Sequence, residues 1–392
     1  MKLRVILYLI GFSAFVASLG QNLYNPLLLQ VQEELHTTSY LVSLSVSLFT
    51  LALAIMQMIF GPLADKRGRK AVLIPSIIVY IVSSIGCAYS PSIGFLLFFR
   101  VLQGIGAAAV PVVAAAIIGD IFRGKALSQG MATYQLLLML APAIGPLIGG
   151  VIGERFGYGA TFLFLAAISI LLLIANLILL PETKPEFSGS KHNSAQNFFL
   201  IFKNPMSVTI LIFGFFQFMV YFIYLTFVPQ ILSKTYSFQP AKTGIILLAM
   251  SLSTIISIKL GGWMLNQFGA RKSLIYGFSL HALSVILFAF TAQISLSFLI
   301  IDVCLFGFFM GLTGSIPITL LTELFPEERA TAIGVYNLIR YLGMASGPMI
   351  GTMLYSGGSI IPLFLTCSLA FSAAIFWGTR LMAKFPVKET IQ

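Results

Sequence analysis

Long, nearly uncharged apolar runs constrain the fold of this chain most strongly. Hydrophobic residues make up 58% of the 392 residues and charged residues 9%, whereas soluble domains carry about 25% charged residues. A run of 18 or more such residues forms a helix that can cross about 30 Å of hydrocarbon. We identify twelve runs, at residues 5–27, 40–61, 72–90, 93–118, 127–152, 160–180, 207–232, 243–264, 273–292, 295–318, 331–354 and 359–381. Because they are continuously apolar rather than alternating, they predict an all-α polytopic membrane protein and not a barrel.

The positive charges predict the orientation of these helices. The net charge is +11, and 17 of the 23 Lys and Arg residues fall at the N-terminus, in the even-to-odd loops and at the C-terminus. Positive residues collect on cytoplasmic loops, so both termini are expected in the cytoplasm and no nucleic-acid partner is needed. The first run is too long for a signal peptide, so we expect it to be retained.

The sequence offers little for catalysis. Cys87, Cys304 and Cys367 each fall inside a span, which supports neither a disulfide framework nor a metal cluster. The chain has three His residues and no phosphate-cradling Gly-Lys-Ser/Thr loop. We therefore expect no metal, no cofactor, no direct use of ATP and no enzyme activity.

The chain carries an internal duplication. The charged turn at residues 61–70 has a blurred copy at residues 262–272, about 200 residues further on, and Gly145-Pro146 recurs 202 residues later as Gly347-Pro348. A polar stretch follows the sixth span. These features predict an N-terminal six-helix bundle at 1–180, a cytoplasmic linker at 181–206 and a C-terminal six-helix bundle at 207–392, as in transporters built from parallel repeats.

Three motifs resemble those of the major facilitator superfamily, and the resemblance covers essentially the whole chain. The turn at 61–70 is similar to the family's loop motif, and Arg100 to Ala107 is similar to its second motif. Residues 141–150 resemble the motif of the twelve-helix drug/proton antiporter branch, with Ala141 where Gly is commoner. The resemblance implies two pseudo-symmetric bundles, the major facilitator fold, with a substrate site between them.

The resemblance also implies a cytoplasmic latch that holds the bundles together. Its members are Gly61, Asp65, Gly68, Arg69 and Asp120. Arg69 is expected to pair with both acids, and Asp65 to lie near the positive end of the helix that begins near Thr331. The alternative is a loop whose positive charges only set the orientation in the membrane. This alternative is sufficient to explain Lys66, Arg67 and Lys70.

An antiporter hinge is predicted in the fifth span, at Gly145, Pro146, Gly149 and Gly150. Proline removes a backbone hydrogen bond and permits a bend, and the glycines allow close packing. An ordinary glycine-rich packing face is the alternative.

Three charges inside the spans are the proton-coupling candidates: Asp302, Arg100 and Arg340. A charge in hydrocarbon is costly, which favours a functional role. Asp302 is the one acidic residue placed deep in a span, so it is the best proton carrier. Snorkelling of Arg100 and a fixed ion pair between Asp302 and Arg340 are the alternatives.

Polar and aromatic residues in the spans are candidates for a substrate cavity. They are Gln21, Asn22, Tyr24, Asn25, Gln103, Tyr134, Gln217, Tyr221 and Tyr224. Many related antiporters carry an acid at the position of Asn22. Amide groups can hydrogen-bond a substrate and aromatic rings can stack on one. The alternatives are that the polar side chains hydrogen-bond one another within the bundle and that the aromatic side chains face the lipid.

These features predict a secondary active exporter in a bacterial cytoplasmic (inner) membrane. We expect a monomer that exchanges protons for lipophilic or amphipathic small molecules by alternating access, as in multidrug efflux and antibiotic resistance. A dedicated exporter of one metabolite, such as an amino acid or sugar derivative, is the alternative within the fold. A membrane enzyme and a non-transporting sensor are alternatives from other classes. The three intramembrane charges sum to about +1, which disfavours a strictly cationic substrate.

Overall fold

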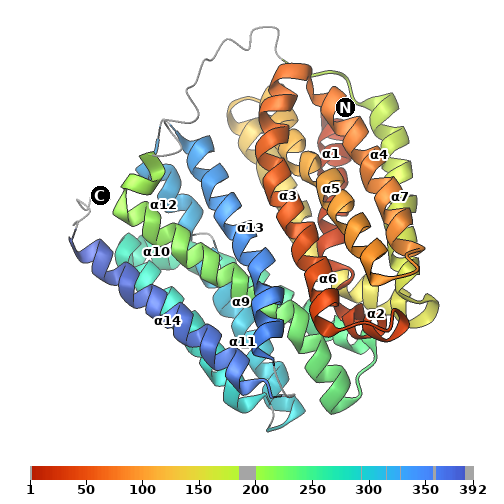
Figure 1. Cartoon of the computed structure of the whole chain (residues 1–392). Coiled ribbons are helices and arrows are strands. Elements are labelled where there is room, and N and C mark those ends of the chain that lie inside the picture. The colour runs from red at the N-terminus through yellow and green to blue at the C-terminus, as the bar shows by residue number, and fades with distance from the viewer. Residues whose placement is uncertain are drawn as a thin grey trace. The chain divides into compact units, whose positions relative to one another are not determined.

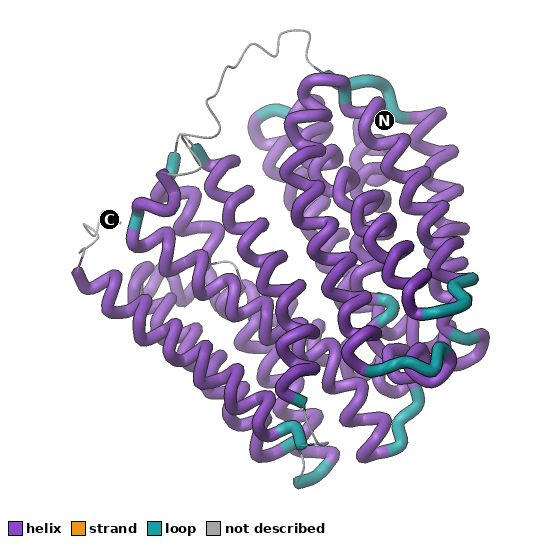
Figure 2. Tube along the Cα trace, in the orientation of Figure 1, coloured by secondary structure: helices purple, strands orange, loops and turns teal. Residues whose placement is uncertain are grey.

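A computed structural model describes residues 2–184, 200–292, 294–314, 316–326, 328–355 and 359–384. All regular structure in these ranges is helical, with no strand (Figure 2). Figure 1 shows the helices in chain order: α1 (Lys2–Asn22), η1 (Asn25–Leu27), α2 (Leu28–Glu34), α3 (Ser39–Arg67), α4 (Arg69–Ala88), α5 (Ile93–Ile121), α6 (Gly124–Phe156), α7 (Tyr158–Leu179), α9 (Pro205–Tyr236), α10 (Pro240–Thr291), α11 (Leu296–Gly314), α12 (Ile316–Leu324), α13 (Arg329–Leu354) and α14 (Ile361–Lys384).

The prediction of a polytopic all-α membrane protein is confirmed. In the described ranges, 11 helical segments are long and apolar enough to cross a membrane. The predicted span at 331–354 corresponds to α13, which has 26 residues but is not among those segments. Asn337 and Arg340 in its middle make it less apolar, so its passage through the membrane stays a prediction.

Helical geometry is interrupted by a glycine at two matching places in the chain. Gly68 separates α3 from α4 with a φ of 108°, and Gly269 breaks α10 with a φ of 73°. Both values are in the left-handed region, which glycine enters without the strain of a Cβ. The two glycines occupy matching positions in the duplicated turn, so the repeat is visible in the backbone as well as in the sequence.

The chain forms two compact units. The first contains Met1–Ser190 and Leu225–Leu248, and the second contains Lys191–Tyr224 and Ala249–Gln392. The ends of α9 and α10 around residues 225–248 therefore group with the first unit. The predicted boundaries at 180 and 206 stay predictions.

Each unit has its own packed interior. In the first, α5 lies against α3 and α4, and α1 lies against α6. In the second, the Tyr224 ring stacks on Phe306 at a centroid distance of 3.8 Å and meets Phe288 at 4.7 Å and Phe364 at 5.2 Å. These four aromatic residues come from α9, α10, α11 and α14, so they tie four helices of the second unit together.

Candidate functional site

Three of the five predicted latch residues meet at one end of the first unit. Arg69, at the start of α4, forms ion pairs with Asp65 at the end of α3 and with Asp120 at the end of α5. Its Nε lies 2.9 Å from Asp120 Oδ2. The Arg69 side chain is 7% exposed, whereas that of Asp65 is 58% exposed. Both expected ion pairs are thus present; the contact of Asp65 with the helix near Thr331 and the latch role stay predictions.

Glu182 completes this cluster and was not singled out from the sequence. Its carboxylate accepts hydrogen bonds from the backbone N–H groups of Arg69 at 2.9 Å and Lys70 at 3.1 Å. These donors at a helix start have no partner within the helix. Thr183 donates its hydroxyl to Asp120 Oδ2 at 3.3 Å. The first residues after α7 therefore bind to the turn between α3 and α4.

The hydrogen bonds also perturb the acidity of Glu182. Partial burial acts to raise the pKa of its carboxyl group, but four backbone N–H groups stabilise the ionised form and hold that pKa below its usual value. The donors belong to Arg69, Lys70, Thr183 and Lys184. Sequence reasoning missed Glu182 because two of these donors come from a turn more than 100 residues earlier.

Arg100 is completely buried in the first unit, so it does not snorkel. Its side chain donates to the carbonyl of Gly20 at 3.0 Å and to Gln103 Oε1 at 2.7 Å. The guanidinium carbon lies 4.3 Å from the Phe49 ring centroid and 5.3 Å from that of Tyr24. Within the described residues no carboxylate pairs with Arg100, and one of its terminal nitrogens has no partner. Aromatic faces and carbonyl oxygens therefore take the place of a counter-ion.

The polar residues of α1 are buried, and most of them have protein partners. Gln21 donates to Thr50 Oγ1 at 3.1 Å, Asn22 to the Ser18 carbonyl at 3.0 Å, and the Tyr24 hydroxyl accepts from Ser45. Asn25 is 0% exposed, and neither atom of its amide group has a partner. Asn25 is thus the one of these four whose hydrogen-bonding capacity is unused.

The remaining cavity candidates of the first unit are also buried. Gln103 accepts from Arg100 and donates to Ser84 Oγ at 2.8 Å. The Tyr134 hydroxyl donates to the Pro111 carbonyl at 2.9 Å. Gln103 therefore shares a network with Arg100, whereas Tyr134 joins α6 to α5.

The predicted hinge lies inside a continuous helix, α6. A Cβ at Gly149 would collide with the Leu23 carbonyl at the end of α1, and one at Gly150 would collide with the Pro240 carbonyl at the start of α10. Glu154 accepts the Ala241 N–H at 3.0 Å one turn further on. The glycines are therefore positions of close backbone contact; bending at Gly145 and Pro146 stays a prediction.

Asp302 and Arg340 do not form an ion pair in the described part of the second unit. Asp302 is 6% exposed and accepts the hydroxyl of Thr291 at the end of α10. The Arg340 guanidinium lies over the rings of Phe218 at 4.9 Å and Tyr341 at 5.1 Å, and its Nε has no partner. The carboxylate is thus left without a cation.

The three cavity candidates of α9 occupy different environments. Gln217 is fully buried and donates to Thr313 Oγ1 at 2.5 Å. Tyr224 belongs to the aromatic interior described above, and its hydroxyl has no partner. Tyr221 is half-buried beside Phe218 and Phe222. Of the three, Tyr221 is the one that retains exposed surface.

A pocket of about 390 Å³ lies elsewhere in the first unit, and none of the predicted residues lines it. Its polar side chains are those of Gln30, Glu33, Glu154, Gln230, Ser233, Ser237, Gln239 and Thr243. No group of three or more His, Cys, Asp or Glu residues that could hold a metal ion is found among the described residues.

Comparison with known proteins matches the profile of the Major Facilitator Superfamily to residues 10–348 and 210–390. A bicyclomycin resistance protein homolog of Haemophilus influenzae is 24% identical over 356 residues, covering 89% of each chain. Citrate exporter 1 of Aspergillus niger is 31% identical over 189 residues, 48% of this chain and 36% of that protein. The chain therefore spans about a third of the length of this fungal relative.

A solved structure shares the fold. A bacterial homolog of the human lysosomal transporter Spinster superposes with a TM-score of 0.77 at 16% sequence identity, covering 97% of this chain and 95% of that one. At this identity the similarity shows the fold alone, which is the major facilitator fold.

Proposed function

This chain belongs to the Major Facilitator Superfamily, and we propose that it exports lipophilic or amphipathic small molecules in exchange for protons. Its family and its structural neighbour are transporters, so the chain is a multi-pass membrane transporter of small molecules and not an enzyme. Proton coupling, multidrug export, a bacterial cytoplasmic membrane, cytoplasmic termini and a monomeric state are parts of the proposal.

The contact of α6 with α1 and α10 carries the export proposal. Gly149 and Gly150 belong to the segment that resembles the antiporter motif, and both bring α6 against the backbone of another helix. Such contacts suit a seal that forms and breaks during alternating access. The bicyclomycin resistance relative, aligned over most of both chains, supports the same direction of transport.

Asp302 is the proposed proton carrier. Among the described side chains it is the one carboxylate that is buried. A carboxylate that accepts a hydroxyl hydrogen bond but faces no cation can take up a proton without losing an ion pair. That environment supports a group that alternates between charged and neutral forms.

A dedicated exporter of an organic anion is the second candidate. Arg340 pairs with no carboxylate in the described structure and its Nε has no partner, so it is a cation available to an anionic substrate. The citrate exporter similarity, over about half of this chain, favours the same class.

Transport in everted membrane vesicles tests both candidates. A pH-sensitive dye inside the vesicles would report proton release when a lipophilic drug or an organic acid such as citrate is added. Drug-dependent proton movement supports multidrug antiport, and a response confined to acids supports the second candidate. No response to either class in vesicles that contain the protein would contradict the proposal.

A further inference from the structure

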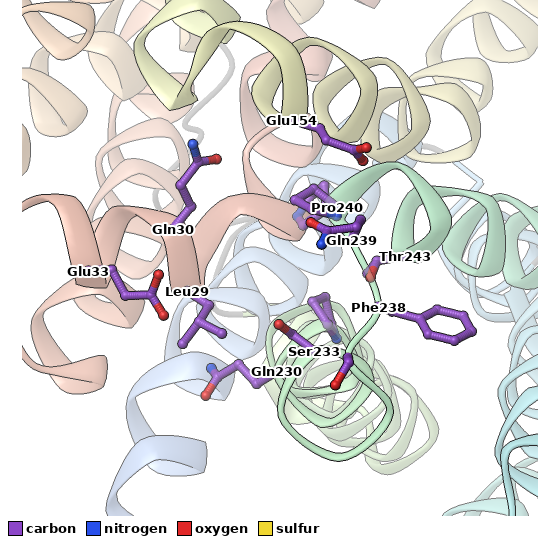
Figure 3. Close-up of a pocket in the computed structure, with 13 residues that line it drawn as sticks. Leu29, Gln30, Glu33, Glu154, Gln230, Ser233, Phe238, Gln239, Pro240 and Thr243 are labelled. Carbon is purple, nitrogen blue, oxygen red and sulfur yellow. The ribbon is translucent and has the colours of Figure 1, made fainter.

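The pocket of about 390 Å³ is a separate candidate binding site. Its lining comes from η1 and α2, from the end of α6, from the end of α9, from the loop that follows α9 and from the start of α10. All of these residues belong to the first compact unit. Figure 3 shows Glu33, Glu154 and Gln230 around the pocket, on three different helices.

The pocket lies at the end of the first unit opposite the latch. α3 begins beside α2 and runs for 29 residues to Arg67, a length of about 43 Å at 1.5 Å per residue. α6 begins just after the latch residue Asp120 and ends beside the pocket at Glu154. The charge pattern that places the latch in the cytoplasm therefore places this pocket on the outer side.

The lining carries negative charge and an excess of acceptors. Glu33 and Glu154 contribute two carboxylates, and the lining contains no Lys, Arg or His. The ammonium group of Lys242 lies 5.9 Å from the ring centroid of Phe238, a lining residue. The ring face of Phe238 is thus a surface that a cation already contacts.

Gln230 supplies an independent indication of a ligand. Its side chain is 4% exposed, its Nε2 donates to the Thr226 carbonyl at 3.2 Å, and its Oε1 is buried with no partner. Gln30 Oε1, on the facing helix, is also buried without a partner. Because a buried acceptor without a donor costs free energy, a bound group that brings an N–H donor would satisfy the Gln230 oxygen.

We propose that this pocket binds a primary ammonium group, held by the amide oxygen of Gln230 and attracted by Glu33 and Glu154. An ammonium group offers three donors and no acceptor, which matches a lining of unpaired acceptors. The volume of about 390 Å³ is large enough for a small organic amine. The site is distinct from the proposed transport residues and does not depend on proton coupling.

Binding of n-butylammonium to the purified full-length protein tests this proposal. Isothermal titration calorimetry at fixed ionic strength should detect one site with a Kd of roughly 1 mM, and neutral n-butanol should not bind there. Gln230→Leu should weaken binding about tenfold because it removes the buried acceptor. Glu33→Gln should weaken it about threefold, because the carboxylate is exposed and screened.

Two further variants keep the test decisive. Glu34→Gln removes the neighbouring exposed acid, which does not line the pocket, and should leave the Kd unchanged. Gln230→Glu keeps the side chain's size, adds a negative charge and should tighten binding. Absence of binding to folded wild-type protein, equal effects of Glu33→Gln and Glu34→Gln, or equal binding of butanol would overturn the proposal.

The ammonium group has two natural sources, a soluble amine and the headgroup of phosphatidylethanolamine. Titrations in phosphatidylcholine nanodiscs with and without phosphatidylethanolamine separate them. Competition by that lipid supports the proposal with the headgroup as occupant, and unchanged binding supports it with a soluble amine. Because the assay uses no proton gradient, its failure would leave the proposed transport function intact.

Discussion

At the residue scale, the proposed proton role of Asp302 depends on its one carboxyl group. Asparagine has nearly the same size and still accepts the Thr291 hydroxyl, but it cannot carry a proton. We expect Asp302→Asn to abolish proton-driven substrate accumulation while substrate binding persists. Vesicle transport under an imposed pH gradient and equilibrium binding of the same substrate measure the two effects.

Glu323 provides the control for this prediction, since it is an exposed acid in the same unit. Glu323→Gln should transport as the wild type does. If Asp302→Asn also retains accumulation driven by the pH gradient, the proton is carried by another group.

Glu182 gives a pH-dependent prediction outside the membrane spans. Its hydrogen bonds lower the folded-state pKa below the usual 4.5. The stabilisation they provide is therefore fully present above that value and is lost as the pH falls through the folded-state pKa. Glu182→Gln should lower the melting temperature modestly at neutral pH, and the difference from wild type should shrink in acid.

Thermal unfolding followed by circular dichroism between neutral and acidic pH measures this difference. Glu34→Gln serves as the control, because Glu34 is an exposed acid of the same unit. A melting-temperature difference that stays constant with pH would show that the Glu182 charge does not contribute.

At the element scale, close backbone contact predicts which glycines tolerate a methyl group. Gly149 has the Leu23 carbonyl in the place that a Cβ would take, so Gly149→Ala should force α6 away from α1. Overpacking of this kind costs about 1–3 kcal/mol. Gly119, in α5, has no atom within 4 Å of the same position, so Gly119→Ala should be neutral or slightly stabilising.

Thermal stability of the purified variants tests the pair. Equal melting temperatures for Gly149→Ala and Gly119→Ala would show that α6 and α1 separate without cost. In that case the close contact would not be a seal.

The elements themselves were predictable because helix length and apolarity are local properties. The internal repeat likewise predicted the turns at 61–70 and 262–272, in which Gly68 and Gly269 interrupt the helices. The ion pairs of Arg69 followed from the family resemblance. By contrast, the partners of Glu182 and the aromatic neighbours of Tyr224 come from distant parts of the chain, so packing, not local sequence, decides them.

Several cavity candidates are buried and have partners within the protein, and their role in a cavity stays a prediction. From the sequence, a polar or aromatic residue in an apolar run indicates a cavity and an internal hydrogen bond equally well. Gln103 and Gln217 have internal partners, and Tyr224 is enclosed by other rings. The pocket around Gln230 was missed because its lining comes from four separate segments at the ends of helices.

At the scale of the whole molecule, the twelve-helix topology depends on α13. This helix has 26 residues, about 39 Å at 1.5 Å per residue, which is enough to cross the hydrocarbon region. Its reduced apolarity comes partly from Arg340, and the rings of Phe218 and Tyr341 cover that guanidinium. Because aromatic contacts lower the cost of the charge, we expect α13 to cross the membrane as the apolar helices do.

Single-cysteine labelling tests this topology. Replacing Cys87, Cys304 and Cys367 with alanine provides the background, into which Glu328→Cys or Tyr355→Cys places one thiol at either end of α13. A membrane-impermeant maleimide added to intact cells should label position 355 and not position 328, and everted vesicles should give the reverse. Labelling of both positions from one side would mean that α13 does not cross, which would leave an odd number of spans and place the two termini on opposite sides of the membrane.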